Sequence, residues 1–172
     1  CIRDRNLIDL IKGLDFLLNK KGVFIFEEPY LGSMYEKTSY DQIYDEHIFM
    51  FSVSSVKKIF SLFGFELIDV APQITHGGSM RYVIARRGEY KVKKIVIQKL
   101  KYEKAKNIDN FKGCINFEKK CEKSKKLLNN RIKKIIKSGK NIAGYAATSK
   151  STTILNYCGI NYKHIDLSLI HI

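Results

Sequence analysis

Apolar positions near the start of the chain first follow a helical period and then become a continuous run. One face of residues 6–22 carries the apolar side chains of Leu7, Leu10, Ile11, Leu14, Leu17 and Leu18. This spacing predicts an amphipathic helix, and Lys20, Lys21 and Gly22 are typical of a helix end. The run "GVFIFEEP" over residues 22–29 then predicts a strand that belongs to a parallel sheet and is covered on both faces.

A second helix and two more strands follow after a long loop. The helical face of residues 53–65 carries Val53, Val56, Ile59, Phe60 and Phe63. The segments "FELIDVA" (65–71) and "SMRYVIARRG" (79–88) predict strands. Because the connection between them is too short for a crossover helix, these two strands should be antiparallel. We therefore expect an α/β fold with a mostly parallel sheet and one antiparallel strand last.

The remaining sequence changes character twice. Residues 91–106 predict a helix, although their start also fits a strand. Residues 111–139 predict a longer helix with an apolar stripe of Cys114, Phe117, Cys121, Leu128, Ile132 and Ile135. Residues 140–160 then read as a short strand, a loop of small residues and a helix. This order predicts the start of a second α/β domain.

These patterns divide the sequence into three parts, namely residues 1–88, a basic helical linker over 89–138, and residues 139–166. We expect a fragment, because the chain starts with Cys1 and no signal peptide precedes the first helix. The last six residues, "LSLIHI", are encoded by CTG TCT CTT ATA CAC ATC, a common transposon-end sequence. We therefore expect residues 167–172 to be a non-native tail.

The formal net charge is +14, and nearly all of it lies in the predicted linker. Residues 1–88 contain 11 basic and 11 acidic side chains, whereas residues 89–140 contain 18 and 5. A helix whose lysines face solvent explains this run, and we prefer that interpretation. The alternative is a surface that binds nucleic acid, for which the run lacks interleaved aromatic residues.

Cysteine use and hydropathy indicate a soluble, cytoplasmic protein. None of the four cysteines, Cys1, Cys114, Cys121 and Cys158, forms a C-x-x-C pair, so no metal site is expected within this sequence. Cys114 and Cys121 would lie about 10 Å apart along a helix, too far for a disulfide. We expect buried thiols in a reducing compartment. No run of about 18 apolar residues predicts a membrane-spanning helix.

The loop after the first strand holds a candidate catalytic group, Tyr44, Glu46 and His47. Tyr44 and His47 are three positions apart, so one helical turn would bring their rings together. A neutral imidazole can abstract a proton near neutral pH, and a phenol can donate to a developing oxyanion. From these residues alone, the preferred interpretation is structural: Tyr44 and His47 simply flank a core helix.

Two further segments place polar groups beside glycines or small residues. The connection "THGGS", residues 75–79, should leave the second parallel strand at the same sheet edge as the Tyr44–His47 loop. We therefore expect the two to share a cleft, although paired glycines equally fit a tight turn. The segment "GYAATSKST", residues 144–152, fits either a helix cap or an anion-binding site.

Five segments, taken in this order, resemble the sugar C-methyltransferase family. They are "GVFIFEEPYL", "YDQIYDEHIFMFS", "FELIDV", "THGGSMRYVIARRG" and "GYAATSKSTTILNYCGI". Members of this family use S-adenosylmethionine to methylate C3 of a nucleotide-linked 4-keto-6-deoxysugar. The resemblance runs from Asn6 to about Asp166. It implies the C-terminal part of a class I, Rossmann-like methyltransferase sheet, followed by the linker and the start of a domain that holds the nucleotide sugar.

The resemblance also implies roles for individual residues. The family's Tyr-x-Glu-His motif would make His47 the base, Tyr44 the donor to the enolate oxygen or an alternative base, and Glu46 the group that orients His47. The residues that would line the site of the nucleotide sugar are His76, Gly78, Ser79, Arg81, Tyr145, Lys150, Ser151 and Thr152. Ala146 departs from the glycine usual in the family, and it disfavours a positive φ there.

The family's zinc-binding portion and its glycine-rich loop for the methyl donor would precede this sequence. Two other hypotheses stay open. One is a non-catalytic binding protein whose basic helices engage nucleic acid or anionic glycans. The other is a methyltransferase of the same fold that transfers the methyl group to oxygen or nitrogen.

Overall fold

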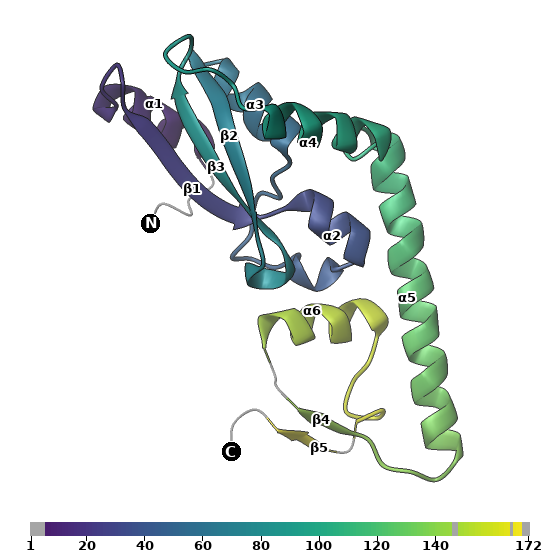
Figure 1. The fold of residues 1–172 in the computed structure, drawn as a ribbon. Helices are drawn as coiled ribbons and strands as arrows, with labels where there is room; N and C mark the ends of the chain where they lie inside the picture. The colour runs from purple at the N-terminus through teal and green to yellow at the C-terminus, as the bar shows by residue number, and fades with distance from the viewer. Residues whose placement is uncertain (1–5, 146–147, 166, 170–172) are drawn as a thin grey trace. The chain divides into compact units, whose positions relative to one another are not determined.

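The computed structural model describes the backbone of residues 6–145, 148–165 and 167–169, and the side chains of the first two ranges (Figure 1). The chain forms two compact units. The first contains Cys1–Lys37 and Ile48–Cys114, and the second contains Thr38–His47 and Ile115–Ile172. Each unit is described by itself below, and the division of the sequence at residues 88 and 138 stays a prediction.

The first unit is built on a three-stranded sheet in the order β1-β3-β2. β1 (Val23–Pro29) and β2 (Phe65–Gln73) each pair antiparallel with β3 (Ser79–Arg86). The two outer strands therefore run in the same direction on either side of β3. The predicted reversal at the last strand is confirmed, whereas its place in a larger Rossmann-like sheet stays a prediction.

β1 differs from the predicted strand with two covered faces. Val23 and Ile25 are 42% and 53% exposed, while the alternate residues Phe24 and Phe26 pack on the core. Within the described residues β1 pairs with β3 alone, in antiparallel fashion. A continuous apolar run does not reveal whether both faces of a strand are covered. The prediction of a parallel strand buried on both faces is therefore wrong for the structure described.

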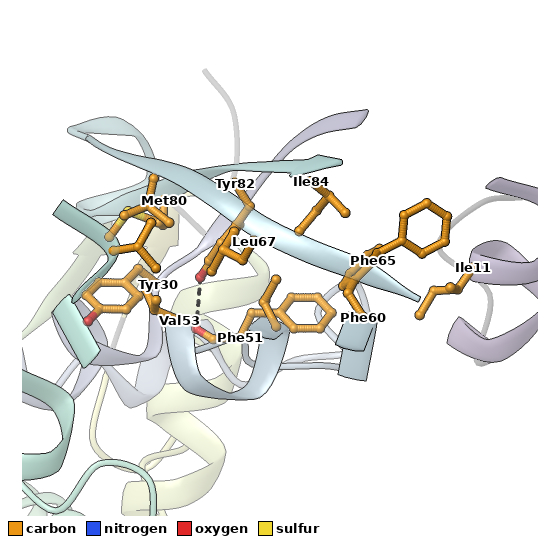
Figure 2. Close-up of a cluster of buried hydrophobic side chains, with 13 residues drawn as sticks. Ile11, Tyr30, Phe51, Val53, Phe60, Phe65, Leu67, Met80, Tyr82 and Ile84 are labelled. Carbon is orange, nitrogen blue, oxygen red and sulfur yellow. Dashed lines mark hydrogen bonds between the residues drawn. The ribbon is translucent and has the colours of Figure 1, made fainter. Parts of the chain in front are cut away.

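α3 (Val53–Ser61) lays its apolar face on this sheet as the spacing predicts. Figure 2 shows the core, in which Phe60, Phe65 and Tyr82 are at most 2% exposed. The Tyr82 hydroxyl donates a hydrogen bond to the carbonyl of Phe51 at 3.4 Å, so its one polar atom is satisfied. Each such buried side chain contributes about 1.5–3 kcal/mol to folding. α1 (Leu7–Leu17) adds the fully buried Ile11 to the same core.

α4 (Lys94–Ala105) is a helix from Lys94 onward, which settles the ambiguity left by its sequence. Its Glu103 side chain is fully buried and accepts hydrogen bonds from four groups of the first unit. The backbone N–H groups of Val53 and Ser54 donate at 2.7 and 2.8 Å, and the hydroxyls of Ser54 and Tyr30 donate at 2.5 and 2.9 Å. Burial, together with the nearby Glu103 carboxylate, raises the pKa of Tyr30. Glu103 thus joins α4 to the first turn of α3.

The second unit contains most of α5 (Phe111–Lys137) and a small parallel sheet. β4 (Ala143–Tyr145) pairs with β5 (Leu167–Leu169), and α6 (Ser149–Cys158) connects the two strands. Strand, helix and parallel strand form an α/β unit here, whereas the predicted second domain over residues 139–166 stays a prediction. Residues 167–169 pair with β4 whatever their origin, so the prediction that they are non-native stays untested.

The cysteine predictions hold for two of the three described thiols. Cys121 and Cys158 are buried, whereas Cys114 is exposed, so its prediction as a buried thiol is wrong. The apolar stripe of α5 is continuous in sequence, but its first member, Cys114, is left exposed. Seven lysines of α5 are exposed, namely Lys112, Lys119, Lys123, Lys126, Lys133, Lys134 and Lys137. Among the described residues, no helix is both long and apolar enough to cross a membrane.

Candidate active site

Tyr44 and His47 meet across a turn in the second unit. The backbone N–H of His47 donates to the Tyr44 carbonyl at 3.0 Å, and the two ring centroids are 5.0 Å apart with an interplanar angle of 72°. Both side chains are half-buried, and Glu46 is exposed. The predicted proximity is therefore present, through a turn rather than a helix. A phenol and an imidazole beside each other at a partly open surface can donate and accept protons.

This turn follows η1 (Tyr40–Gln42), which packs on α6. Tyr40 is 7% exposed, its ring centroid lies 5.1 Å from that of Tyr157, and its hydroxyl lies 3.6 Å from Sγ of Cys158. Further along, the Thr153 hydroxyl shares its proton between the carbonyl of Ile43 at 3.3 Å and that of Ser149 at 3.2 Å. Burial raises the pKa of Tyr40, so this phenol stays neutral. The candidate catalytic residues are thus carried by a segment that α6 supports.

The start of α6 is a capping box. Oγ1 of Thr148 accepts from the Ser151 N–H at 3.4 Å, and the Thr148 N–H donates to Oγ of Ser151 at 2.7 Å. The Thr152 hydroxyl donates to the Thr148 carbonyl at 3.2 Å. The hydroxyls of Ser151 and Thr152 thus serve the cap, which is one of the two interpretations left open by the sequence. Lys150 is half-buried in the same turn of the helix.

The other predicted contacts of this unit precede α6. Tyr145 ends β4 and is 82% exposed. Ala146, which departs from the family's glycine, lies outside the described residues. Tyr145, Lys150, Ser151 and Thr152 therefore belong to the same unit as the Tyr44–His47 turn. Their roles in binding stay predictions.

The predicted residues of the first unit gather around η2 (Thr75–Gly77). Ser79 is 2% exposed, and its hydroxyl donates to the Thr75 carbonyl at 3.1 Å. Gly78 has φ 131° and ψ 100°, and a Cβ placed there would lie 2.5 Å from Oγ of Ser33. Both residues are therefore explained by the packing of this turn. His76 is exposed with a left-handed φ of 50°, which is uncommon for a residue with a side chain.

A carboxylate that the sequence did not single out organises this region. Glu27 of β1 lies opposite Arg81 of β3, and the guanidinium donates to the carboxylate at 3.1 Å. The Thr75 hydroxyl donates to the same carboxylate at 2.7 Å. The hydrogen bond from Thr75, aided by Arg81 and the charge of His76, lowers the pKa of Glu27. The signal for it was the acidic pair Glu27 and Glu28 at the end of an apolar strand.

The predicted site residues are therefore distributed over both units. The Tyr44–His47 turn lies in the second unit, and the loop from His76 to Arg81 lies in the first. A shared cleft between them stays a prediction. In the part of the chain that the structure describes, no cluster of three or more His, Cys, Asp or Glu side chains could hold a metal ion.

A basic hollow of about 740 Å³ lies along one face of α5 in the second unit. It is lined by Thr38, Lys120, Lys123, Ser124, Leu127, Leu128 and Arg131. The lining contains three cationic side chains and no carboxylate. Such a lining favours binding of a polyanion.

Comparison with known proteins decides the family. Residues 74–169, more than half of the chain, match the family described as the C-methyltransferase C-terminal domain. The chain belongs to this C-methyltransferase family. The matched residues include β3, both helices α5 and α6, and the strands β4 and β5.

A curated C-methyltransferase is also similar to this chain. C-methyltransferase NovU from Streptomyces niveus is 27% identical over 158 residues, which are 91% of this chain and 38% of NovU. The chain thus spans well under half of the length of this C-methyltransferase. Because the match covers 91% of this chain, the few residues outside it lie near the ends. Tyr44 and His47 therefore fall within the matched segment.

Proposed function

We propose that this chain is part of an S-adenosylmethionine-dependent C-methyltransferase that acts on C3 of a nucleotide-linked 4-keto-6-deoxysugar. Family membership supports carbon as the methyl acceptor. The resemblance of the five sequence segments supports the sugar substrate. The observation that carries the proposal is the contact between the Tyr44 and His47 rings, 5.0 Å between centroids, at a partly open surface.

In the proposed reaction the C4 ketone of the sugar acidifies the C3 hydrogen. His47 accepts that proton, and the Tyr44 hydroxyl donates a hydrogen bond to the oxygen of the resulting enolate; the reverse assignment, with Tyr44 as the base, is the alternative. Glu46 orients the imidazole. General base catalysis of this kind contributes about 10²–10⁴-fold to the rate.

S-adenosylmethionine supplies the methyl group in this proposal. The described strand-to-helix connections of the first unit do not include a glycine-rich loop; β1, for instance, enters α2 (Leu31–Lys37) through Tyr30. We therefore assign none of the described residues to the methyl donor. The sugar nucleotide is proposed to contact the loop from His76 to Arg81 and the start of α6.

The proposal is tested by replacing His47 with Gln in the complete protein that contains this chain. We expect hydrogen exchange between solvent and C3 of the ketosugar to fall about 10²–10⁴-fold, because the base is lost. His164→Gln, in the same unit and outside the proposed site, is the matched control and should exchange at the normal rate. Undiminished exchange in the His47 variant would remove His47 from the mechanism.

The same experiment separates the proposal from its competitors. An O- or N-methyltransferase has no reason to exchange a carbon-bound hydrogen, so absence of exchange in the unaltered protein would favour that class. A non-catalytic binding protein is favoured by the basic hollow on α5. That hypothesis expects neither exchange nor methyl transfer in the complete protein.

A further inference from the structure

The segment Thr38–His47 belongs to the second unit, although in sequence it lies between α2 and α3 of the first. Within the second unit this segment has few internal hydrogen bonds. η1 is a single turn, and the Tyr44–His47 turn is closed by one backbone hydrogen bond. Side chains that attach it to the helices of that unit therefore help to fix its position.

Tyr40 is the principal attachment. It is 7% exposed, and its hydroxyl lies near Ser124 of α5 and 3.6 Å from Sγ of Cys158 in α6. Its ring is in contact with Tyr157, at 5.1 Å between centroids. The Tyr157 hydroxyl in turn donates to Glu122 of α5 at 2.6 Å. Both helices thus hold Tyr40 in one place.

A second attachment fixes the direction of the segment along α6. Tyr40 lies beside Tyr157 and Cys158 at the end of the helix, whereas the carbonyl of Ile43 accepts from Thr153 near its middle. Residue numbers therefore increase along the segment as they decrease along α6. Thr153 is about one turn, 5.4 Å, beyond the first helical residue Ser149. The residues that follow Ile43, including Tyr44, therefore begin about one helical turn from the capped start of α6.

We propose that Tyr40 is a positioning residue that holds the Tyr44–His47 pair in register with α6. This inference rests on the proposed function, and it adds that contacts with α6 hold the proton-transfer groups in place. Tyr40 is four positions before Tyr44 and seven before His47, so a small displacement of its ring is transmitted to both. A misplacement of about 1 Å at reacting groups can cost about 10²-fold in rate.

The kinetic test compares Tyr40→Leu with Ile132→Ala in the complete protein. Ile132 is 8% exposed and belongs to the same core cluster as Cys158, so its variant loosens that cluster while the Tyr40 side chain is kept. We expect Tyr40→Leu to lower kcat about 10–100-fold with KM for the nucleotide sugar changed less than twofold. Ile132→Ala should lower kcat less than Tyr40→Leu at a temperature where it is folded, because the Tyr40 ring and hydroxyl are still present. Tyr40→Phe, which keeps the ring contact with Tyr157, should recover most of the lost kcat.

A physical measurement separates this inference from the proposed function. Amide hydrogen exchange over residues 40–47 should accelerate at least tenfold in Tyr40→Leu, whereas exchange in β3 of the first unit should not change. Unchanged exchange over residues 40–47 would overturn the positioning role, whatever the kinetics. Accelerated exchange with normal kcat would keep the attachment but remove Tyr44 and His47 from the proposed mechanism, whereas full activity in His47→Gln would remove His47 alone.

If Tyr40→Leu does not fold, the second attachment provides the test. Thr153→Val keeps the side-chain volume and removes the hydroxyl that reaches the Ile43 carbonyl. We expect kcat to fall about threefold to tenfold with KM nearly unchanged, and Thr153→Ser to restore it. Equal kcat in the Val and Ser variants would contradict the register between this segment and α6.

Discussion

Some interactions of the candidate site could be found from the sequence, and others could not. Tyr44 and His47 could be found from the sequence because they are three positions apart, and any turn brings such residues together. The partners of Glu27 and Glu103 could not be found, because they are more than 45 positions away along the chain. A carboxylate becomes recognisable as a structural centre only when the fold has brought its donors to it.

Gly78 gives the sharpest residue-level prediction. A methyl group there would lie 2.5 Å from Oγ of Ser33, and its φ of 131° is unfavourable for any residue with a side chain. We expect Gly78→Ala to lower the free energy of unfolding by about 2–4 kcal/mol, from the clash and the backbone strain together. Denaturant unfolding measures this directly.

Gly88 is the matched control for that measurement. It also has a positive φ, 82°, but a Cβ there would meet nothing within 4 Å. Gly88→Ala should therefore cost about 1 kcal/mol, from the backbone alone. Equal losses at the two positions would show that the contact with Ser33 does not explain Gly78.

At the scale of elements, periodicity predicted the helices well and their surroundings poorly. α1, α3 and α5 appear where apolar residues recur at helical spacing. α2 was missed because it is only seven residues long and contains Gly32. The covered faces of β1 and the burial of Cys114 were predicted wrongly, because a pattern shows which face is apolar but not what lies against it.

The attachment of α4 to α3 leads to the prediction at this scale. The Glu103 carboxylate is fully buried and receives the N–H groups of Val53 and Ser54 and the hydroxyl of Tyr30. Glu103→Gln replaces one acceptor oxygen by an amide that can only donate, which leaves buried donors unpaired. We expect a loss of about 2–4 kcal/mol in the free energy of unfolding. Glu118→Gln, at an exposed position of α5, should change it by less than about 0.5 kcal/mol.

Thermal unfolding followed by circular dichroism would compare these two variants. A Glu103 variant as stable as the Glu118 variant would mean that α4 is held mainly by its apolar contacts, such as those of Val96. In that case the hydrogen bonds to Tyr30 and α3 would contribute little, because each exchanges with bonds to water in the unfolded chain.

For the whole molecule, the association of Thr38–His47 with the second unit was the feature furthest from prediction. Sequence order assigns this segment to the first 88 residues, and no local pattern marks it as separate. Its assignment depends on contacts between Tyr40 and residues more than 80 positions later. Topological rules could place the segment after β1, but only the packing of Tyr40 reveals which helices support it.

At the scale of the whole molecule, the distribution of charge provides a test that separates the enzyme from the non-catalytic binding protein. If the basic hollow on α5 binds nucleic acid through Lys120, Lys123 and Arg131, three phosphate contacts are available. The affinity should then fall about 40-fold between 50 and 200 mM salt, since the logarithmic slope is about −0.9 per contact. Fluorescence anisotropy with a mixed-sequence duplex measures this slope.

Under the proposed function we expect only nonspecific binding, with a Kd above about 1 μM at 150 mM salt, because exposed lysines on a helix attract any polyanion weakly. Replacing Lys120, Lys123 and Arg131 by Ala should then lower the affinity for the duplex no more than replacing Lys133, Lys134 and Lys137. The second triple variant removes the same charge outside the hollow. A nanomolar Kd at 150 mM salt that only the first triple variant abolishes would show a built polyanion site. That result would favour the binding protein, because general electrostatic attraction depends on how many charges are removed and not on which face of α5 carries them.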